Sequence, residues 1–244
     1  MPERDVAAAV ARLGTVLSVW AHPDDETYLA GGIMAAAAAN GQRVACASAT
    51  AGERGTADPD RWPPERLGRV RRWEAAAAMA VLGVGDHRFL DLPDGGLAGV
   101  GAGVGVGLVS ALIDEVRPDT VLTFGPDGGT FHPDHRTVSA WTTAAWRQCG
   151  SPGRLLYSAL AADHLATWAA LYEEWGVFMT DERPAGVPPG GLALDLELTG
   201  ELLDRKIAAL CAMHTQVAPA LAHLGEDVYR AANNRESYLA APRE

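Results

Sequence analysis

Several features that point to particular classes of protein are scarce in this chain of 244 residues. Lysine and arginine number 20 against 31 aspartate and glutamate residues, and the resulting net charge of -11 disfavours broad binding to nucleic acids or anionic membranes. The three cysteines lie far apart in apolar stretches, which favours reduced, buried thiols over disulfides or thiolate metal sites. The apolar stretch 95–113 is too rich in glycine for a membrane span, and residues 1–14 have no secretory signal pattern. We therefore expect a cytoplasmic protein with no nucleic-acid or membrane partner, and the sequence leaves a homo-oligomer open.

Short apolar runs alternate with longer helical patterns along the chain. Strands are predicted at 15–21, 43–50, 87–90, 120–124, 155–160 and 192–198. Helices are predicted at 29–40, 65–82, 108–116, 133–148, 165–175 and 200–214. This alternation predicts an α/β fold with a mostly parallel sheet and helices on both faces. No repeat or linker divides the chain, so we expect residues 1–244 to form a single domain.

Two short motifs combine histidine and aspartate after predicted strands. The sequence AHPDDE, at residues 21–26, follows the first predicted strand, and HPDHR, at 132–136, follows the loop that leaves the strand at 120–124. Ligands of open α/β sheets bind beyond the carboxyl ends of the strands. We therefore expect the two motifs, although about 110 positions apart, to meet at that edge.

The motifs contain the ligands of a catalytic metal site. Catalytic zinc takes three protein ligands, usually nitrogen or carboxylate oxygen, and leaves one position for water. His22 and Asp25 are three positions apart and share one side of a turn, and His135 completes the set from the second motif. A set of two histidines and one aspartate suits Zn²⁺, although other divalent metals such as Fe²⁺ also fit.

Three further residues of the motifs suit catalysis. Asp24 is a second carboxylate that could take a proton from metal-bound water. His132 could stabilise the oxyanion or protonate the departing amine, and Asp134 could hold its ring and raise its pKa. Helix capping is the simpler alternative for Asp24, Asp25 and Asp134, which all lie near predicted helix starts. Two such motifs after separate strands of one sheet favour the metal site.

The order of the motifs, AHPDDE and then HPDH, resembles the PIG-L / LmbE-like family of zinc-dependent N-deacetylases, chiefly over the first 150 residues. The resemblance implies a Rossmann-like fold and substrates of the N-acetylglucosamine type. It makes His22, Asp25 and His135 the zinc ligands, Asp24 the general base and His132 the acid or electrostatic partner. These roles agree with those drawn from the chemistry of the residues.

Further matches and departures concern the substrate side of the site. Arg71 resembles a family arginine that meets the polar aglycone, and the alternative is a surface arginine paired with a nearby glutamate. Asp94, in the sequence DLPDGGL, resembles a family aspartate that binds sugar hydroxyls, and the alternative is a plain turn residue. Family members usually have glycine where this chain has Phe131, and some have an upstream tyrosine where it has Thr130. Phe131 is equally compatible with a packed loop anchor.

The predicted function is a metal-dependent hydrolase that removes the N-acetyl group from an N-acetylglucosaminyl-type small-molecule conjugate, by attack of a zinc-bound water. The conjugate would be a thiol precursor or a secondary-metabolite glycoside. One alternative is an amidase that cleaves a larger acyl or cysteinyl amide on a related sugar conjugate, since Trp20, Tyr28 and Phe131 lie near the motifs. The other is a non-catalytic metal- or sugar-binding protein, which the presence of both Asp24 and His132 disfavours.

Overall fold

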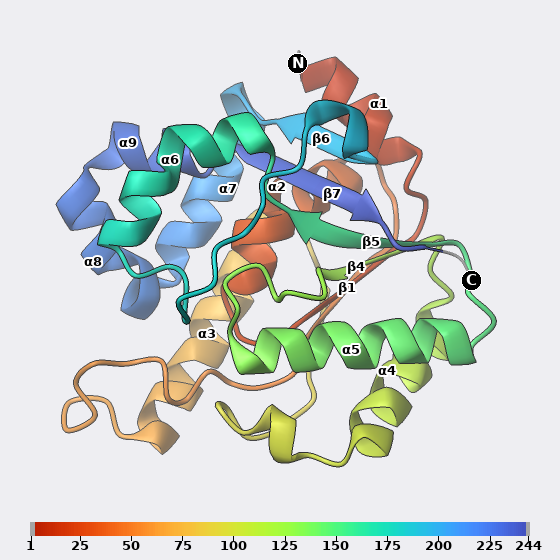
Figure 1. Cartoon of the computed structure of the whole chain (residues 1–244), viewed down its shortest axis with the longest axis horizontal. Helices are drawn as coiled ribbons and strands as arrows, with labels where there is room; N and C mark the ends of the chain where they lie inside the picture. The colour runs from red at the N-terminus through yellow and green to blue at the C-terminus, as the bar shows by residue number, and fades with distance from the viewer. Residues whose placement is uncertain (1–2, 243–244) are drawn as a thin grey trace.

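A single seven-stranded sheet organises the protein, in a computed structural model that describes residues 3–242 (Figure 1). The order of the strands is β3-β2-β1-β4-β5-β7-β6. The strands are β1 Val16–Trp20, β2 Val44–Ser48, β3 Asp86–Phe89, β4 Thr120–Phe124, β5 Arg154–Ala159, β6 Leu194–Glu197 and β7 Arg235–Ala240. The first five strands pair in parallel, and every residue of β1, β2 and β4 is buried. Such apolar runs are typical of strands covered on both faces, and the predicted α/β fold is confirmed.

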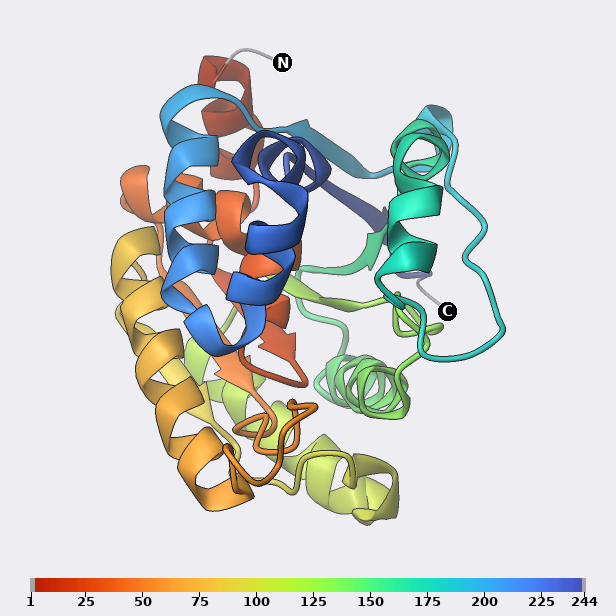
Figure 2. The same ribbon diagram turned by 90° about the vertical axis from the view of Figure 1, so that its left-hand side faces the viewer.

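Helices cover both faces of the sheet, as Figures 1 and 2 show. The helices α2, α3 and α7 pack together on one face, whereas α4 and α5 pack together on the other. The helices are α1 Glu3–Ala11, α2 Asp25–Ala39, α3 Pro64–Leu82, α4 Ala102–Val116, α5 Pro133–Gln148, α6 Ala162–Glu174, α7 Gly200–Ala212, α8 His214–Leu224 and α9 Glu226–Ala232, with short 3₁₀ helices at Leu97–Gly99 and Pro189–Gly191.

Helices α2 and α4 begin well before the positions that the sequence pattern predicts. Helix α2 begins at Asp25, within the first motif, so Asp25 lies in its first turn. Helix α4 begins at Ala102 and includes three glycines that precede the predicted start at residue 108. A Cβ atom at Gly105 would lie 2.1 Å from the Trp141 ring of α5, so glycine is required where these two helices meet. Tertiary packing has therefore overridden low helix propensity.

The C-terminal third differs from the parallel part. Strand β7, which the sequence pattern did not predict, lies between β5 and β6 and pairs antiparallel to both. Its Glu236 side chain is buried, accepts hydrogen bonds from the backbone N–H groups of Gly32 and Ile33, and forms a 2.8 Å ion pair with Lys206. Strand β7 is thereby tied to α2 and α7 across one face of the sheet.

The state of the cysteines can be compared with the expectation from the sequence. All three cysteines are free, as predicted, but only Cys46 is buried, whereas Cys211 is exposed, contrary to the expectation of a buried thiol. Within residues 3–242 no single helix is long and apolar enough to cross a membrane. Helices α7 and α8 reach the required length and hydropathy only as a pair, and this pair is bent by 117°.

Candidate metal and catalytic site

The two motifs meet where the order of the strands reverses. The first loop, residues 21–25, leaves β1, and the second loop, residues 125–132, leaves β4, which pairs directly with β1. From β1 the chain proceeds to β2 on one side, and from β4 it proceeds to β5 on the other. This is the position at which open α/β sheets bind ligands.

The three predicted metal ligands converge. His22 Nδ1 lies 3.2 Å from His135 Nε2 and 3.5 Å from Asp25 Oδ2, and His135 Nε2 lies 3.3 Å from Asp25 Oδ1. Ligands bonded at 2.0–2.1 Å to a tetrahedral zinc ion are about 3.3 Å apart. All three side chains are buried. The geometry therefore fits a divalent cation.

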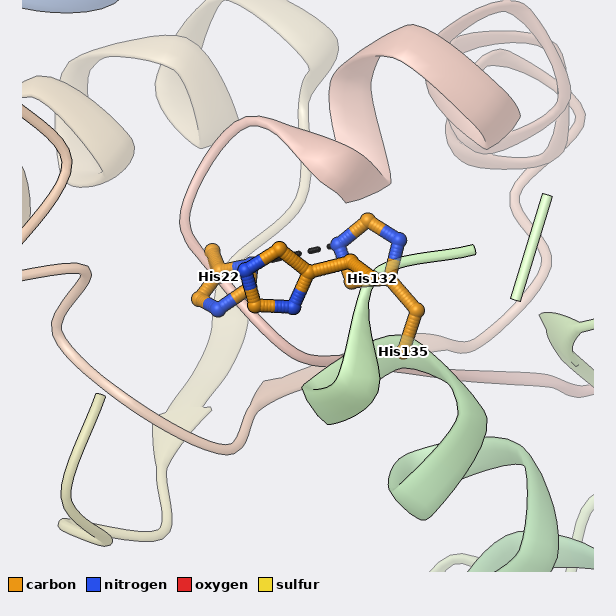
Figure 3. Close-up of side chains that lie close together, drawn as sticks. All are labelled: His22, His132 and His135. Atoms are coloured by element: carbon orange, nitrogen blue, oxygen red, sulfur yellow. Dashed lines mark hydrogen bonds between the residues drawn. The ribbon is translucent and has the colours of Figure 1, made fainter. Parts of the chain in front are cut away.

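A second set of possible ligands overlaps the first. The rings of His22, His132 and His135 also bring nitrogen atoms within 4.8 Å of one another, and Figure 3 shows the three side chains close together. We favour Asp25 as the third ligand because its carboxylate oxygens lie 3.5 Å from His22 Nδ1 and 3.3 Å from His135 Nε2 and contribute negative charge. His132 Nδ1 already accepts a 3.1 Å hydrogen bond from the Asp134 backbone N–H.

Carboxylates orient the ring of His22. Its Nε2 atom lies 3.1 Å from Asp94 Oδ1 and 3.3 Å from Asp134 Oδ2, which leaves Nδ1 to face the ligand centre. Burial lowers the pKa of His22, but hydrogen bonds to Asp134, Asp25 and Asp94 outweigh it and raise the pKa well above 6.5. This environment favours positive charge, and a metal-bound histidine commonly donates its other N–H to a carboxylate.

The second loop and β4 orient the ring of His135. Its Nδ1 atom lies 3.0 Å from the carbonyl oxygen of Gly128 and 3.1 Å from Thr130 Oγ1. The ring stacks on Phe124, with centroids 4.1 Å apart and planes inclined by 11°. Burial lowers the pKa of His135 to about 4, so the imidazole is neutral near pH 7 and Nε2 is available as a ligand.

Asp24 has a strained backbone and a perturbed carboxylate. Its φ of 121° lies in a region that side-chain-bearing residues rarely adopt, and such strain is concentrated at functional sites. Burial raises the pKa of Asp24 to about 6, although Arg71 opposes this shift with an Nη2 atom 3.1 Å from Asp24 Oδ2. A carboxylate with a pKa near 6 is ionised at neutral pH and basic enough to accept a proton.

Helix capping, the alternative role for Asp24, Asp25 and Asp134, does not match the contacts of their side chains. Asp24 occupies the N-cap position of α2, but its side chain makes no capping hydrogen bond. The Asp25 carboxylate accepts from the backbone N–H of His22 at 2.8 Å. At the start of α5 the capping side chain belongs to His132 instead.

The expected pairing of Asp134 with His132 is wrong. The Asp134 carboxylate accepts hydrogen bonds from the backbone N–H groups of Gly95 and Leu97 and faces His22. Burial and the charge of His22 lower the pKa of His132 in spite of the nearby carboxylates, whereas we expected it to be raised. Since His132 Nδ1 accepts a hydrogen bond, its neutral ring carries the proton on Nε2. His132 can therefore donate a hydrogen bond from Nε2.

Arg71 does not match either expectation. Its side chain is 4% exposed, so it is neither a surface arginine nor open to an aglycone. Its guanidinium donates to the carbonyl oxygens of Gly52, at 2.7 Å, and Pro23, at 2.5 Å, as well as to Asp24. Glu74 binds Thr215 instead. Arg71 thus braces the first loop from helix α3.

Asp94 lies beside the predicted ligands, but its carboxylate is already engaged. Oδ1 faces His22, and Oδ2 accepts from the backbone N–H of Arg54 at 2.7 Å. The residue is 5% exposed, and its pKa falls to about 2 because bonding to His22 outweighs burial. Asp94 therefore orients the ring of His22, a predicted metal ligand. Binding of sugar hydroxyls by Asp94 stays a prediction.

Sequence reasoning gave no role to Glu26 and no ligand-orienting role to Thr130. Both oxygens of the Glu26 carboxylate accept from the Asp24 backbone N–H at 3.2 Å, and burial together with the Asp24 charge raises its pKa to about 8. Glu26 was visible as the last residue of the first motif, whereas the hydroxyl of Thr130 had no motif to mark it.

Comparisons with known proteins agree with this geometry. Residues 17–146 match the PIG-L family, described as GlcNAc-PI de-N-acetylase. A 1D-myo-inositol 2-acetamido-2-deoxy-alpha-D-glucopyranoside deacetylase from Mycolicibacterium vanbaalenii is 34% identical over 230 residues, covering 83% of this chain and 81% of the relative.

Solved structures share the fold. The A40926 pseudoaglycone deacetylase superimposes with a TM-score of 0.69 at 22% identity, covering 95% of this chain and 100% of that one. The 4-carboxy-2-hydroxymuconate hydratase of Pseudomonas putida KT2440 has a TM-score of 0.63 at 19% identity, with coverage of 95% and 98%. Because the fold is compatible with a second reaction class, function has to be argued from the site. The family match, the similarity to the mycobacterial deacetylase and the convergence of the two motifs together show that this chain belongs to the PIG-L family.

Proposed function

We propose that this protein is a zinc-dependent N-deacetylase of N-acetylglucosaminyl conjugates of small molecules. The observation that carries the proposal is the convergence of His22, Asp25 and His135 at distances of 3.2–3.5 Å, with a separate carboxylate, Asp24, next to them in the chain. A binding protein needs the three ligands but has no use for the additional base. Two nitrogen ligands and one carboxylate are typical of catalytic zinc.

Each side chain of the site has a separate role in the proposed hydrolysis. When bound, the metal ion would polarise the amide carbonyl and lower the pKa of water. Asp24, with a pKa of about 6, accepts the proton of the attacking water. The Nε2–H of His132 hydrogen-bonds the carbonyl oxygen as negative charge develops there, and the proton held by Asp24 passes to the departing amine. Asp94 and Asp134 keep the His22 ring in one tautomer throughout.

The names of the similar proteins suggest the class of substrate. One relative deacetylates an N-acetylglucosamine joined to inositol, and a structural neighbour deacetylates the A40926 pseudoaglycone. We therefore propose N-acetylglucosamine attached to a small aglycone. A larger acyl group is the second candidate, because Met179, whose backbone N–H donates to Thr130 of the second loop, has an apolar side chain that is 58% exposed.

Acetate release tests the proposal. Purified protein with one equivalent of zinc should release acetate from N-acetylglucosaminyl-inositol, lose the activity on chelation and regain it when zinc is added. The matched substrate carries an octanoyl group in place of acetyl and separates the two candidates. The non-catalytic alternative is favoured if zinc binds tightly and neither amide is cleaved by the wild-type protein.

A further inference from the structure

Phe131 has an unusual backbone conformation for a bulky residue. Its φ of 63° lies in the left-handed region, which glycine adopts freely and an aromatic residue adopts at a cost in free energy. The next residue is His132, whose ring occupies the site. A change in the backbone at Phe131 would therefore redirect the His132 side chain, and something must hold Phe131 in place.

The holding contacts come from a distant part of the chain. Residues 178–182, which we name the clasp, follow helix α6 and lie against the second loop. The ring of Phe178 lies 6.2 Å from that of Phe131 in an edge-on arrangement, and Phe131 is only 5% exposed. The Arg136 guanidinium lies 5.3 Å from the centre of the Phe131 ring. The side chain of Phe131 is thus enclosed although its backbone is strained.

Two polar contacts fix the clasp on either side of this aromatic pair. The backbone N–H of Met179 donates to the carbonyl oxygen of Thr130 at 2.8 Å, directly before the strained residue. Arg136 Nη2 lies 2.7 Å from Glu182 Oε1, on the helix that follows the second loop. The clasp therefore contacts the backbone before Phe131, its ring, and the first turns of α5.

The clasp is itself anchored away from the site. The ring of Tyr172, on α6, lies 6.1 Å from Phe178, and Arg183 lies 5.3 Å from the centre of the Phe178 ring. Phe178 therefore has contacts with Tyr172 and Arg183 in addition to its contact with Phe131. A ring with several such contacts keeps a fixed position against Phe131.

We propose that Phe178 and Met179 are positioning residues, which hold Phe131 in the left-handed conformation and thereby direct the His132 ring into the catalytic site. The proposal rests on the proposed function for its consequence in catalysis. It predicts that glycine at position 131 makes the clasp dispensable, because glycine adopts this φ without the aromatic contact.

A double-mutant cycle tests the coupling. Phe178→Ala should lower kcat by about tenfold, with KM changed less than about threefold and zinc content unchanged, since a small misplacement of a reacting group is costly. Phe131→Gly alone should keep most of the activity. In the Phe131→Gly background, adding Phe178→Ala should change kcat by less than about twofold. Phe178→Leu retains apolar bulk and should recover part of the activity if Phe178→Ala fails to fold.

The matched control is Trp168→Ala. Trp168 lies on helix α6, which precedes the clasp, and its ring contact, also at 6.2 Å, is with His164 of that helix. Its loss should leave kcat unchanged. An equal fall in kcat on adding Phe178→Ala in the wild-type and Phe131→Gly backgrounds would overturn the proposal, and so would a loss of zinc from Phe178→Ala.

A measurement without turnover separates this proposal from the proposed function. The imidazole NMR resonances of His132, assigned with His132→Gln, should move in Phe178→Ala and return toward their original positions in the Phe178→Ala/Phe131→Gly double variant. If the wild-type protein released no acetate, the deacetylase assignment would fail while these resonances still decided on the clasp. Resonances that do not move in Phe178→Ala would refute the positioning role.

Discussion

The two loops that form the site are held in different ways. The first loop is supported by nearby residues of the same motif and by Arg71, a buried arginine of α3. The second loop continues directly into α5, whose Asp134 accepts hydrogen bonds from the turn at 94–97, and the distant clasp contacts the loop itself at Thr130 and Phe131. The first loop therefore has contacts inside its own motif as well as a distant one from Arg71, whereas the second loop depends on the clasp for its contacts at Thr130 and Phe131.

The largest fall in kcat is expected from substitution of Asp24 in the first loop or His132 in the second. Asp24→Asn and His132→Gln should each lower kcat by about 10²–10⁴-fold, because each removes a group that transfers or stabilises charge. Steady-state kinetics with metal analysis measures both. Asp24→Asn should keep its zinc, since Arg71, itself bound to Gly52, still donates to the Pro23 carbonyl oxygen of the first loop. Loss of zinc from Asp24→Asn would show that the first loop is not independently braced.

An intermediate effect is expected from two adjacent glycines of the second loop. Gly128 and Gly129 have φ values of 78° and 71°, but only at Gly128 would a Cβ meet other atoms, at 2.9 Å from His135 Cβ and 3.0 Å from the Arg136 nitrogen. Gly129→Ala should cost about 1–2 kcal/mol of stability and leave zinc affinity unchanged. Gly128→Ala should also weaken zinc binding by about 10–100-fold, because His135 must move.

Competition titration with a zinc-binding dye, together with chemical denaturation, separates the two effects. Equal zinc affinities for the two alanine variants would show that the ligand position does not depend on the close approach at Gly128.

The smallest effect is expected at the Thr130 hydroxyl. Thr130→Val keeps the shape of the side chain but removes the oxygen that faces His135 Nδ1, while the carbonyl oxygen of Gly128 still accepts. Zinc affinity should fall by about tenfold, the lower end for loss of an outer partner. Thr130→Ser retains the hydroxyl and serves as the control. An effect of Thr130→Val as large as that of Gly128→Ala would place the main support of His135 in the hydroxyl.

The parallel sheet and the convergence of ligands could be predicted because their signals are local. Apolar runs mark the strands, and the spacing of His22 and Asp25 is set by a single turn. The topology of a parallel sheet then brings the second motif to the same edge, so His135 could be assigned without any knowledge of its contacts.

The long-range contacts that hold the site and the sheet could not be predicted, because they join residues far apart in sequence. Asp134 was paired with its neighbour His132, whereas its carboxylate binds backbone N–H groups nearly 40 positions earlier. Strand β7 mixes charged and apolar residues, and its buried Glu236 is explained only by Lys206 and the N–H groups of α2. Phe131 is visible in the sequence as a departure from the family pattern. Its strained backbone and its contact with Phe178, 47 positions later, have no signal in the sequence.

The place of β7 in the sheet has a consequence for the order in which the molecule assembles. Strand β6 has no pairing partner other than β7 among the described strands, and β7 is the last of them to be synthesised. The first five strands can associate while the chain is still emerging from the ribosome, but β6 must wait for residues 235–240. The clasp lies between β5 and β6, so we expect the second loop to reach its final form only after the ligands of the first loop are already in place.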